Sequence, residues 1–162
     1  MRSERYTKFI SRLKTKDLIP LDGAIGTELQ KRGVKMDGSW CGSASLHQDI
    51  LKKVHIDYIN AGSKIITTNT YASSRIMLKA AGMEKRFEEI NLKAINSALS
   101  ARKETNKNDV LIAGSISHRY PIADGDILSQ AVVNISKNEL QDSTDEMLHL
   151  LSNNGCDLIL LE

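Results

Sequence analysis

Hydrophobic positions along this chain follow two patterns, helical spacing and short continuous apolar runs. Residues such as Tyr6, Phe9 and Leu13 recur at helical spacing, which predicts amphipathic helices. The apolar runs are of strand length and lie between glycine or polar segments. Helices are predicted over Ser3–Leu13, Thr27–Arg32, Leu46–Asn60, Ser74–Ala81, Glu84–Lys103 and from Ser136 to Gly155, and strands over Leu18–Leu21, Lys64–Thr68, Val110–Ala113 and Leu158–Leu161.

The order of these elements predicts the fold class. The order is a strand–helix unit repeated four times, with the helix of the last unit missing. The strands lack apolar–polar alternation, which is typical of a parallel sheet covered on both faces. We therefore expect an α/β fold of parallel strand–helix units with four strands. No composition shift marks a boundary, so residues 1–162 are predicted to form one domain.

Composition and charge exclude several functional classes. The basic residues are scattered among acidic ones and the net charge is only +2, which argues against a nucleic-acid partner. A membrane helix needs about 18 consecutive apolar residues, and the sequence contains no such run. Cys41 and Cys156 lie far apart, without metal-binding or disulfide spacing. Together these features favour a cytoplasmic protein without membrane contact.

Polar residues gather where the predicted strands end. Ligands bind at the carboxyl edge of parallel sheets, so the sequence predicts a site there. Two of these residues, Asp22 and Glu162, are carboxylates that would repel one another without a cation between them, either a substrate ammonium group or a metal. The polar strand ends are Asp22, Thr67 to Thr70 (with Thr68 and Asn69), Ser115 to His118, and Glu162.

Each candidate also has a simpler interpretation. Asp22 precedes Gly23 and would serve equally as the cap of a turn, and Glu162 as a solvated chain end. His55 lies within a predicted helix and is interpreted as a packing residue. Trp40 and Cys41 belong to a glycine-containing loop that either folds over the site or plugs the edge of the sheet. Cys156 is interpreted as a small core residue.

Four segments resemble the homocysteine S-methyltransferase family in order and spacing: LDGAIGTELQKRG, VHIDYINAGSKIITTNTYASS, VLIAGSIS and GCDLILLE. The family includes betaine–homocysteine methyltransferases and the homocysteine-binding module of cobalamin-dependent methionine synthase. The resemblance implies a (β/α)₈ barrel in which zinc, held by three cysteines, binds the homocysteine sulfur as a thiolate. That thiolate attacks a small methyl donor, namely betaine, S-methylmethionine or methyltetrahydrofolate.

The resemblance also assigns roles to single residues. It implies that Asp22 and Gly23 hold the amino acid part of homocysteine and that Glu162 takes the ammonium group. Thr68, Asn69 and Ser115 complete the expected substrate-binding set. The family zinc cysteines lie in later strands, so neither Cys41 nor Cys156 matches them, and no catalytic or metal-binding residue is assigned here.

The chain therefore corresponds to the first half of a barrel that usually has about 250 residues. We expect the isolated chain to be inactive, because the zinc cysteines are absent. Two open apolar edges predict that it self-associates or pairs with a chain that supplies the other half. The alternative is a non-catalytic module that binds an amino acid or another copy of itself. The family usually has Gly-Pro after the third strand, whereas this chain has Ser117–Tyr120, which suggests a different loop.

Overall fold

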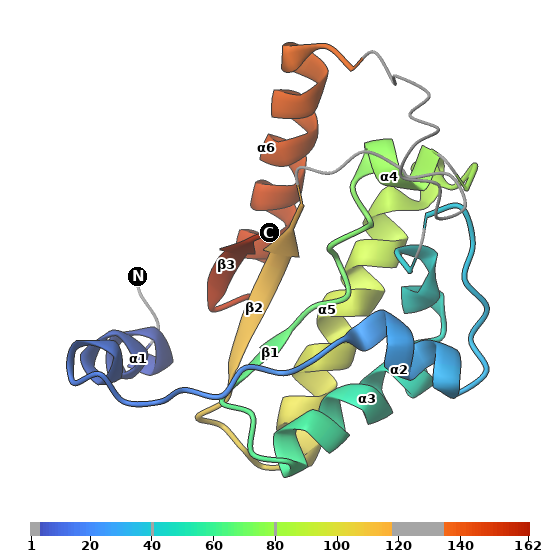
Figure 1. Ribbon diagram of the computed structural model, residues 1–162. Coiled ribbons are helices and arrows are strands. Elements are labelled where there is room, and N and C mark those ends of the chain that lie inside the picture. Colours follow the sequence, from blue (N-terminus) through green and yellow to red (C-terminus); the bar gives the residue numbers. More distant parts are fainter. Residues whose placement is uncertain (1–3, 40, 80, 118–134) are drawn as a thin grey trace.

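A parallel three-stranded sheet in the order β1-β2-β3 organises the molecule, with most helices on one of its faces (Figure 1). The computed structural model describes residues 4–39, 41–79, 81–117 and 135–162. The strands are β1 (Ile65–Thr67), β2 (Leu111–Ile116) and β3 (Leu158–Leu161). The helices are α1 (Glu4–Lys14), α2 (Ile25–Lys31), α3 (Gln48–Asn60), α4 (Arg75–Lys79), α5 (Phe87–Glu104) and α6 (Lys137–Asn153), with 3₁₀ turns η1 (Ser43–Leu46) and η2 (Glu84–Arg86).

The predicted α/β class and the parallel pairing are confirmed. β1 pairs with β2 and β2 with β3 in parallel register, so their carboxyl ends share one edge. A capping box of Ser136 and Glu139 opens α6, and Gly155 follows that helix with φ of +99°. Gly62 ends α3 in the same way, with φ of +107°. A residue with a side chain is strained in this conformation, which explains both glycines.

The prediction of four strands is wrong for the described residues, because the first apolar run forms no strand. Only Leu21 pairs with β1, through an isolated parallel bridge to Ile65. Pro20 lacks an N–H group, so it takes part in the ladder only through its carbonyl, which accepts the N–H of Lys64 at 2.8 Å. Leu18 is 92% exposed. A proline and an unpaired outer edge limit this segment to a single bridge.

β2 is longer than predicted, and this moves one candidate residue. The apolar run stops at Ala113, but the strand continues to Ile116 because β3 pairs with residues 113–116. Ser115 was expected to follow the strand and instead lies within it, fully buried. This strand is extended by its pairing with β3. The local pattern of polar residues does not reveal that pairing.

The helix-covered face of the sheet holds most of the core. α3 and α5 pack against one another and against this face, and α6 covers the β2 and β3 side (Figure 1). Ile66 and Ile112 are fully buried there. His55 of α3 is fully buried as well, and burial lowers its pKa to about 4, so the imidazole is neutral at physiological pH. This placement agrees with the interpretation of His55 as a packing residue.

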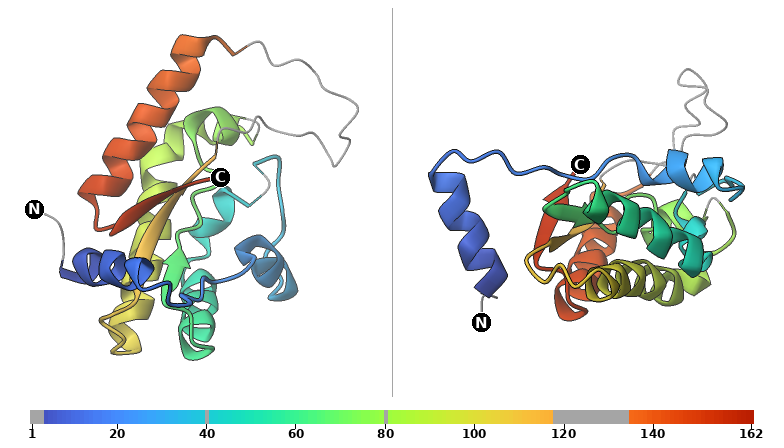
Figure 2. Two further views of the ribbon diagram at one scale, coloured as in Figure 1. Left: turned by 60° about the vertical axis from the view of Figure 1, so that its left-hand side comes forward. Right: turned by 90° about the horizontal axis from the view of Figure 1, so that it is seen from below.

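α1 lies on the opposite side of the sheet from α3 and α5 (Figure 2). Phe9 of α1 packs with Ile65, Leu111 and Ala113, which point away from the main helix layer. No residue of α1 is fully buried, so the helix covers this face only in part. None of the described helices is long and apolar enough to cross a bilayer.

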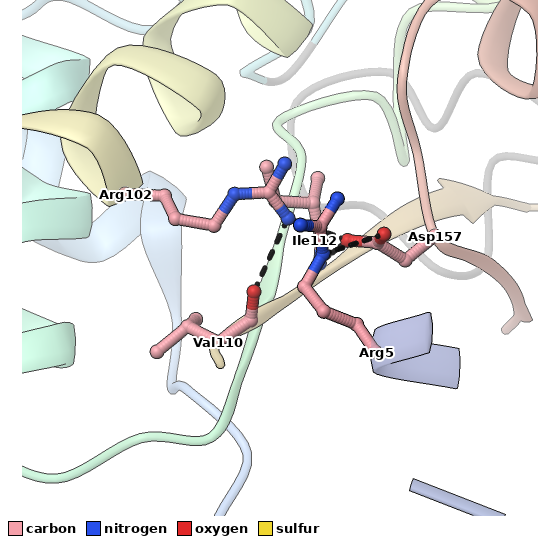
Figure 3. A network of polar contacts seen from close by, with 5 residues as sticks. All are labelled: Arg5, Arg102, Val110, Ile112 and Asp157. Atoms are coloured by element: carbon pink, nitrogen blue, oxygen red, sulfur yellow. Dashed lines mark hydrogen bonds and ion pairs between the residues drawn. The ribbon is translucent and has the colours of Figure 1, made fainter. Parts of the chain in front are cut away.

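A buried ion network ties α1 and α5 to the sheet (Figure 3). The side chain of Asp157 is only 3% exposed and lies just before β3. Its Oδ2 accepts hydrogen bonds from Arg102 Nη1 at 2.6 Å and from the Ile112 N–H at 3.0 Å, and its Oδ1 accepts one from Arg5 Nε at 3.1 Å. Arg102 also donates to the carbonyl of Val110. One carboxylate thus joins α1, α5 and β2 at the amino-terminal edge of the sheet.

Candidate functional site

Asp22 lies at the carboxyl edge of the sheet, held by β1. Its Oδ2 accepts the N–H of Thr67 at 2.7 Å, and its Oδ1 accepts the Thr67 hydroxyl, also at 2.7 Å. The Asp22 N–H donates to the carbonyl of Ile65 at 3.0 Å. The side chain thus bonds to β1, in contrast to the alternative in which it caps the turn that follows. The carboxylate is positioned by the sheet and not by the turn that follows it.

Glu162 follows β3 directly and extends its pairing with β2. Its N–H donates to the carbonyl of Ile116 at 3.0 Å, and the Ser115 hydroxyl donates to its Oε1 at 2.8 Å. The residue is exposed, but its backbone and its carboxylate are both engaged. The geometry therefore favours a positioned side chain over the alternative of a solvated chain end.

The charge of Glu162 acts on Asp22. Burial raises the pKa of Asp22 to about 6, and the negative charge of Glu162 adds to the increase. The hydrogen bonds from Thr67 act in the opposite direction, because they favour the ionised form. The structure thus brings the predicted pair to one edge, where a cation placed between them would relieve their repulsion.

Thr68 and Asn69 are buried and already bonded within the protein. The Thr68 hydroxyl lies 2.7 Å from the Thr70 hydroxyl and 3.3 Å from the carbonyl of Ala113. The Asn69 amide donates to the carbonyl of Cys41 at 2.8 Å and to the Ser45 hydroxyl at 3.0 Å. These contacts hold neighbouring loops together. Substrate binding by Thr68 and Asn69 stays a prediction.

Glycines allow two close approaches around this edge. A Cβ atom on Gly23 would lie 2.9 Å from the hydroxyl oxygen of Tyr58, which donates to the carbonyl of Ala24. A Cβ atom on Gly42 would overlap the backbone carbonyl of Ala72. The loop that carries Cys41 is therefore seated against the segment after β1. Two further residues that the sequence analysis considered, Trp40 and His118, lie outside the described residues.

Thr67 was among the polar strand ends in the sequence, but the expected substrate-binding set left it out. That set contains Thr68 and Asn69, which follow Thr67 directly. Residues two apart in a strand point to the same face, so Thr67 shares a face with Ile65, the bridge partner of Leu21. That this face of β1 meets Asp22 depends on the bridge between Leu21 and Ile65, which the sequence pattern does not show.

The zinc site that the resemblance implies does not fit the described part of this chain. Residues 4–39, 41–79, 81–117 and 135–162 contain no group of three or more histidine, cysteine, aspartate or glutamate side chains able to hold a metal ion. Burial raises the pKa of Cys41 to about 11 and that of Cys156 to about 12, so both thiols stay protonated. Cys156 packs against the hydrophobic cluster around Leu151, as predicted for a core residue.

Known proteins resemble this chain in sequence and in fold. A family model for homocysteine S-methyltransferases matches residues 19–162. Homocysteine S-methyltransferase 2 of Zea mays is 31% identical over 157 residues, covering 88% of this chain and 46% of that protein. S-methylmethionine–homocysteine S-methyltransferase BHMT2 of Pongo abelii is 31% identical over 108 residues, covering 66% of this chain and 28% of that protein. The chain thus spans less than half the length of these two relatives.

A solved structure extends the likeness to three dimensions. The homocysteine methyltransferase MmuM from Escherichia coli, in its metallated form, matches with a TM-score of 0.73 at 27% identity. The match covers 94% of this chain and 56% of that one. With a family model that covers residues 19–162 and a shared fold, this chain belongs to the homocysteine S-methyltransferase family.

Proposed function

We propose that this chain is the homocysteine-binding portion of a zinc-dependent S-methyltransferase, which transfers a methyl group from a small donor to homocysteine and forms methionine. The observation that carries the proposal is the placement of Asp22 and Glu162 at one sheet edge, each held by a hydroxyl group from the neighbouring strand. The reaction is inferred from the family to which the chain belongs. In this proposal residues 1–162 are one domain that forms the first half of a (β/α)₈ barrel.

The chemistry of the edge suits an amino acid ligand. The ammonium group of homocysteine would lie between Asp22 and Glu162 and compensate their charges. A cation near a carboxylate favours its ionised form, so binding would lower the pKa of Asp22 from its value of about 6. Gly23 contributes by letting the chain after Asp22 pass close to Tyr58.

The activation of the homocysteine sulfur needs groups that the described residues do not provide. When zinc is bound in the complete site, it would hold the sulfur as a thiolate. Cys41 and Cys156 belong to different hydrophobic clusters and keep their protons. We therefore propose that residues 1–162 alone bind no stoichiometric zinc and transfer no methyl group. A cytoplasmic location stays a prediction.

Binding of L-homocysteine to the chain tests the proposal. In a two-dimensional ¹H–¹⁵N NMR titration, we expect L-homocysteine to shift the backbone signals of Asp22 and Glu162. Asp22→Asn should weaken this binding about 10- to 100-fold, because one of the two charges facing the ammonium group is removed. Asp145→Asn, at an exposed position of α6, is the matched control and should leave the affinity unchanged. 4-Mercaptobutyrate, which lacks the amino group, should not bind; equal affinity for it would refute the proposal.

A second candidate function is a non-catalytic module that associates with another copy or with a complementary half-barrel. The observation in its favour is that large apolar side chains are exposed at both sides of the sheet. Leu18 is 92% exposed at one side, and Leu161 is 74% exposed at the other. Apolar strand edges of this kind favour pairing between chains. We expect light scattering at micromolar concentration to give at least twice the mass of one chain; a well-folded monomer would remove this candidate.

A further inference from the structure

We propose that Thr67 is a positioning residue, which holds the Asp22 carboxylate in the orientation and ionised form that bind an ammonium group. The inference rests on the proposed function only for the identity of the ligand. Thr67 contacts both carboxylate oxygens, through its N–H to Oδ2 and through its hydroxyl to Oδ1, each at 2.7 Å. Two contacts from one residue fix the plane of the carboxylate.

The same two contacts leave room for a ligand. An ionised carboxylate has about four acceptor positions, and Thr67 occupies one on each oxygen. The remaining position on each oxygen can accept from an ammonium group, which has three N–H donors. Thr67 is held in turn by strand pairing, because it lies opposite Ala113 of β2 in parallel register. The orientation of Asp22 is thus set by the sheet and is present before a ligand arrives.

Thr67 also acts on the charge of Asp22. Burial and the charge of Glu162 favour the protonated carboxyl, whereas both Thr67 hydrogen bonds favour the carboxylate. Asp22 also faces Tyr58 of α3, whose pKa is raised by burial and by the charges of Glu28 and Asp22. With a pKa of about 6, Asp22 is mainly ionised at pH 7. Loss of the hydroxyl contact would raise this pKa further and reduce the ionised fraction where the ligand binds.

Ser115 has a corresponding position beside the second carboxylate. Its hydroxyl donates to Glu162 Oε1 at 2.8 Å, and it lies in β2, the strand next to Glu162. Each of the two acids is therefore held by a hydroxyl from the neighbouring strand of the sheet. For Ser115, which the sequence placed among the substrate-binding residues, this contact indicates the same kind of positioning role.

The first test follows the charge of Asp22 without any ligand. The carboxyl carbon of Asp22 is titrated by NMR in the full 162-residue chain. Thr67→Val keeps the shape and the backbone N–H but removes the hydroxyl, so we expect the Asp22 pKa to rise by at least half a unit. Thr67→Ser retains the hydroxyl and should restore the original value. Thr105→Val, which removes a hydroxyl bonded to the carbonyl of Ala101 at the end of α5, is the matched control.

The outcomes separate this inference from the proposed function. An unchanged Asp22 pKa in Thr67→Val, or in Thr67→Ala if the valine variant does not fold, would overturn the positioning role. L-homocysteine should then bind Thr67→Val at least threefold more weakly than the parent chain at pH 7, with a smaller difference at pH 8.5. A rise in the Asp22 pKa combined with no homocysteine binding to the parent chain would refute the proposed function and leave the effect of Thr67 on Asp22 standing.

Discussion

Replacement of Asp157 by alanine is expected to lower the free energy of unfolding by about 3–5 kcal/mol, the usual loss when one partner of a buried ion pair is removed. The variant leaves the guanidinium of Arg102, whose side chain is 10% exposed, without its carboxylate. It also removes the acceptor of the Ile112 N–H and the partner of Arg5. Urea denaturation followed by circular dichroism measures the change.

The matched control for this variant is Asp109→Ala. Asp109 pairs with Lys64 at 3.0 Å, but the two side chains are 63% and 39% exposed. Exposed ion pairs contribute about 0–1 kcal/mol, so this variant should change stability far less. Equal losses for the two variants would show that the buried network around Asp157 does not hold α1 and α5 to the sheet.

Leu151→Ala is expected to lower the free energy of unfolding by about 2–5 kcal/mol, because it opens a cavity in the core. Leu151 lies in α6, and its side chain is fully buried. It packs in the cluster that contains Ile116 and Met147 and covers Gly114, where a Cβ atom would lie 3.0 Å from its Cδ1. The midpoint of urea denaturation reports the loss.

Leu161→Ala tests the same chemical change at an exposed position. Leu161 ends β3 and is 74% exposed. Its truncation should cost less than about 1 kcal/mol, since little apolar surface is returned to water. A loss as large as that of Leu151→Ala would mean that Leu161 is covered in solution, as it would be if a second chain packed on β3.

The helices were predictable because their signals are local. Periodic apolar residues, the capping box at Ser136 and the glycine after α6 all act within a few residues of the helix they define. β3 was predicted with its observed bounds for a similar reason, since four apolar residues lie between Asp157 and Glu162. The predicted first strand did not form. Pro20 has no backbone N–H, and the effect of this on strand pairing depends on which segment lies beside it, which the sequence does not show.

The candidate site was predictable in part. Asp22 and Glu162 were selected because each follows an apolar run, and parallel strands bring such ends to one edge. Thr67 was left out because its role depends on which face of β1 points to Asp22. Asn69 was selected, yet its amide bonds to Cys41 and Ser45, residues more than 20 positions away in the chain. The polar residues after the apolar runs identified the carboxyl edge of the sheet. The hydrogen-bond partners of these residues depend on tertiary contacts and could not be predicted.

The sequence by itself determined the α/β class, the family and the two carboxylates at the sheet edge, because periodicity and motifs are properties of neighbouring residues. Only the tertiary structure decided the length of β2, the bridge at Leu21 and the pairing of Asp22 with Thr67. Each of these depends on strand register, which joins segments 44 or more residues apart. A register is set by the packing of the whole sheet, so no local pattern contains it.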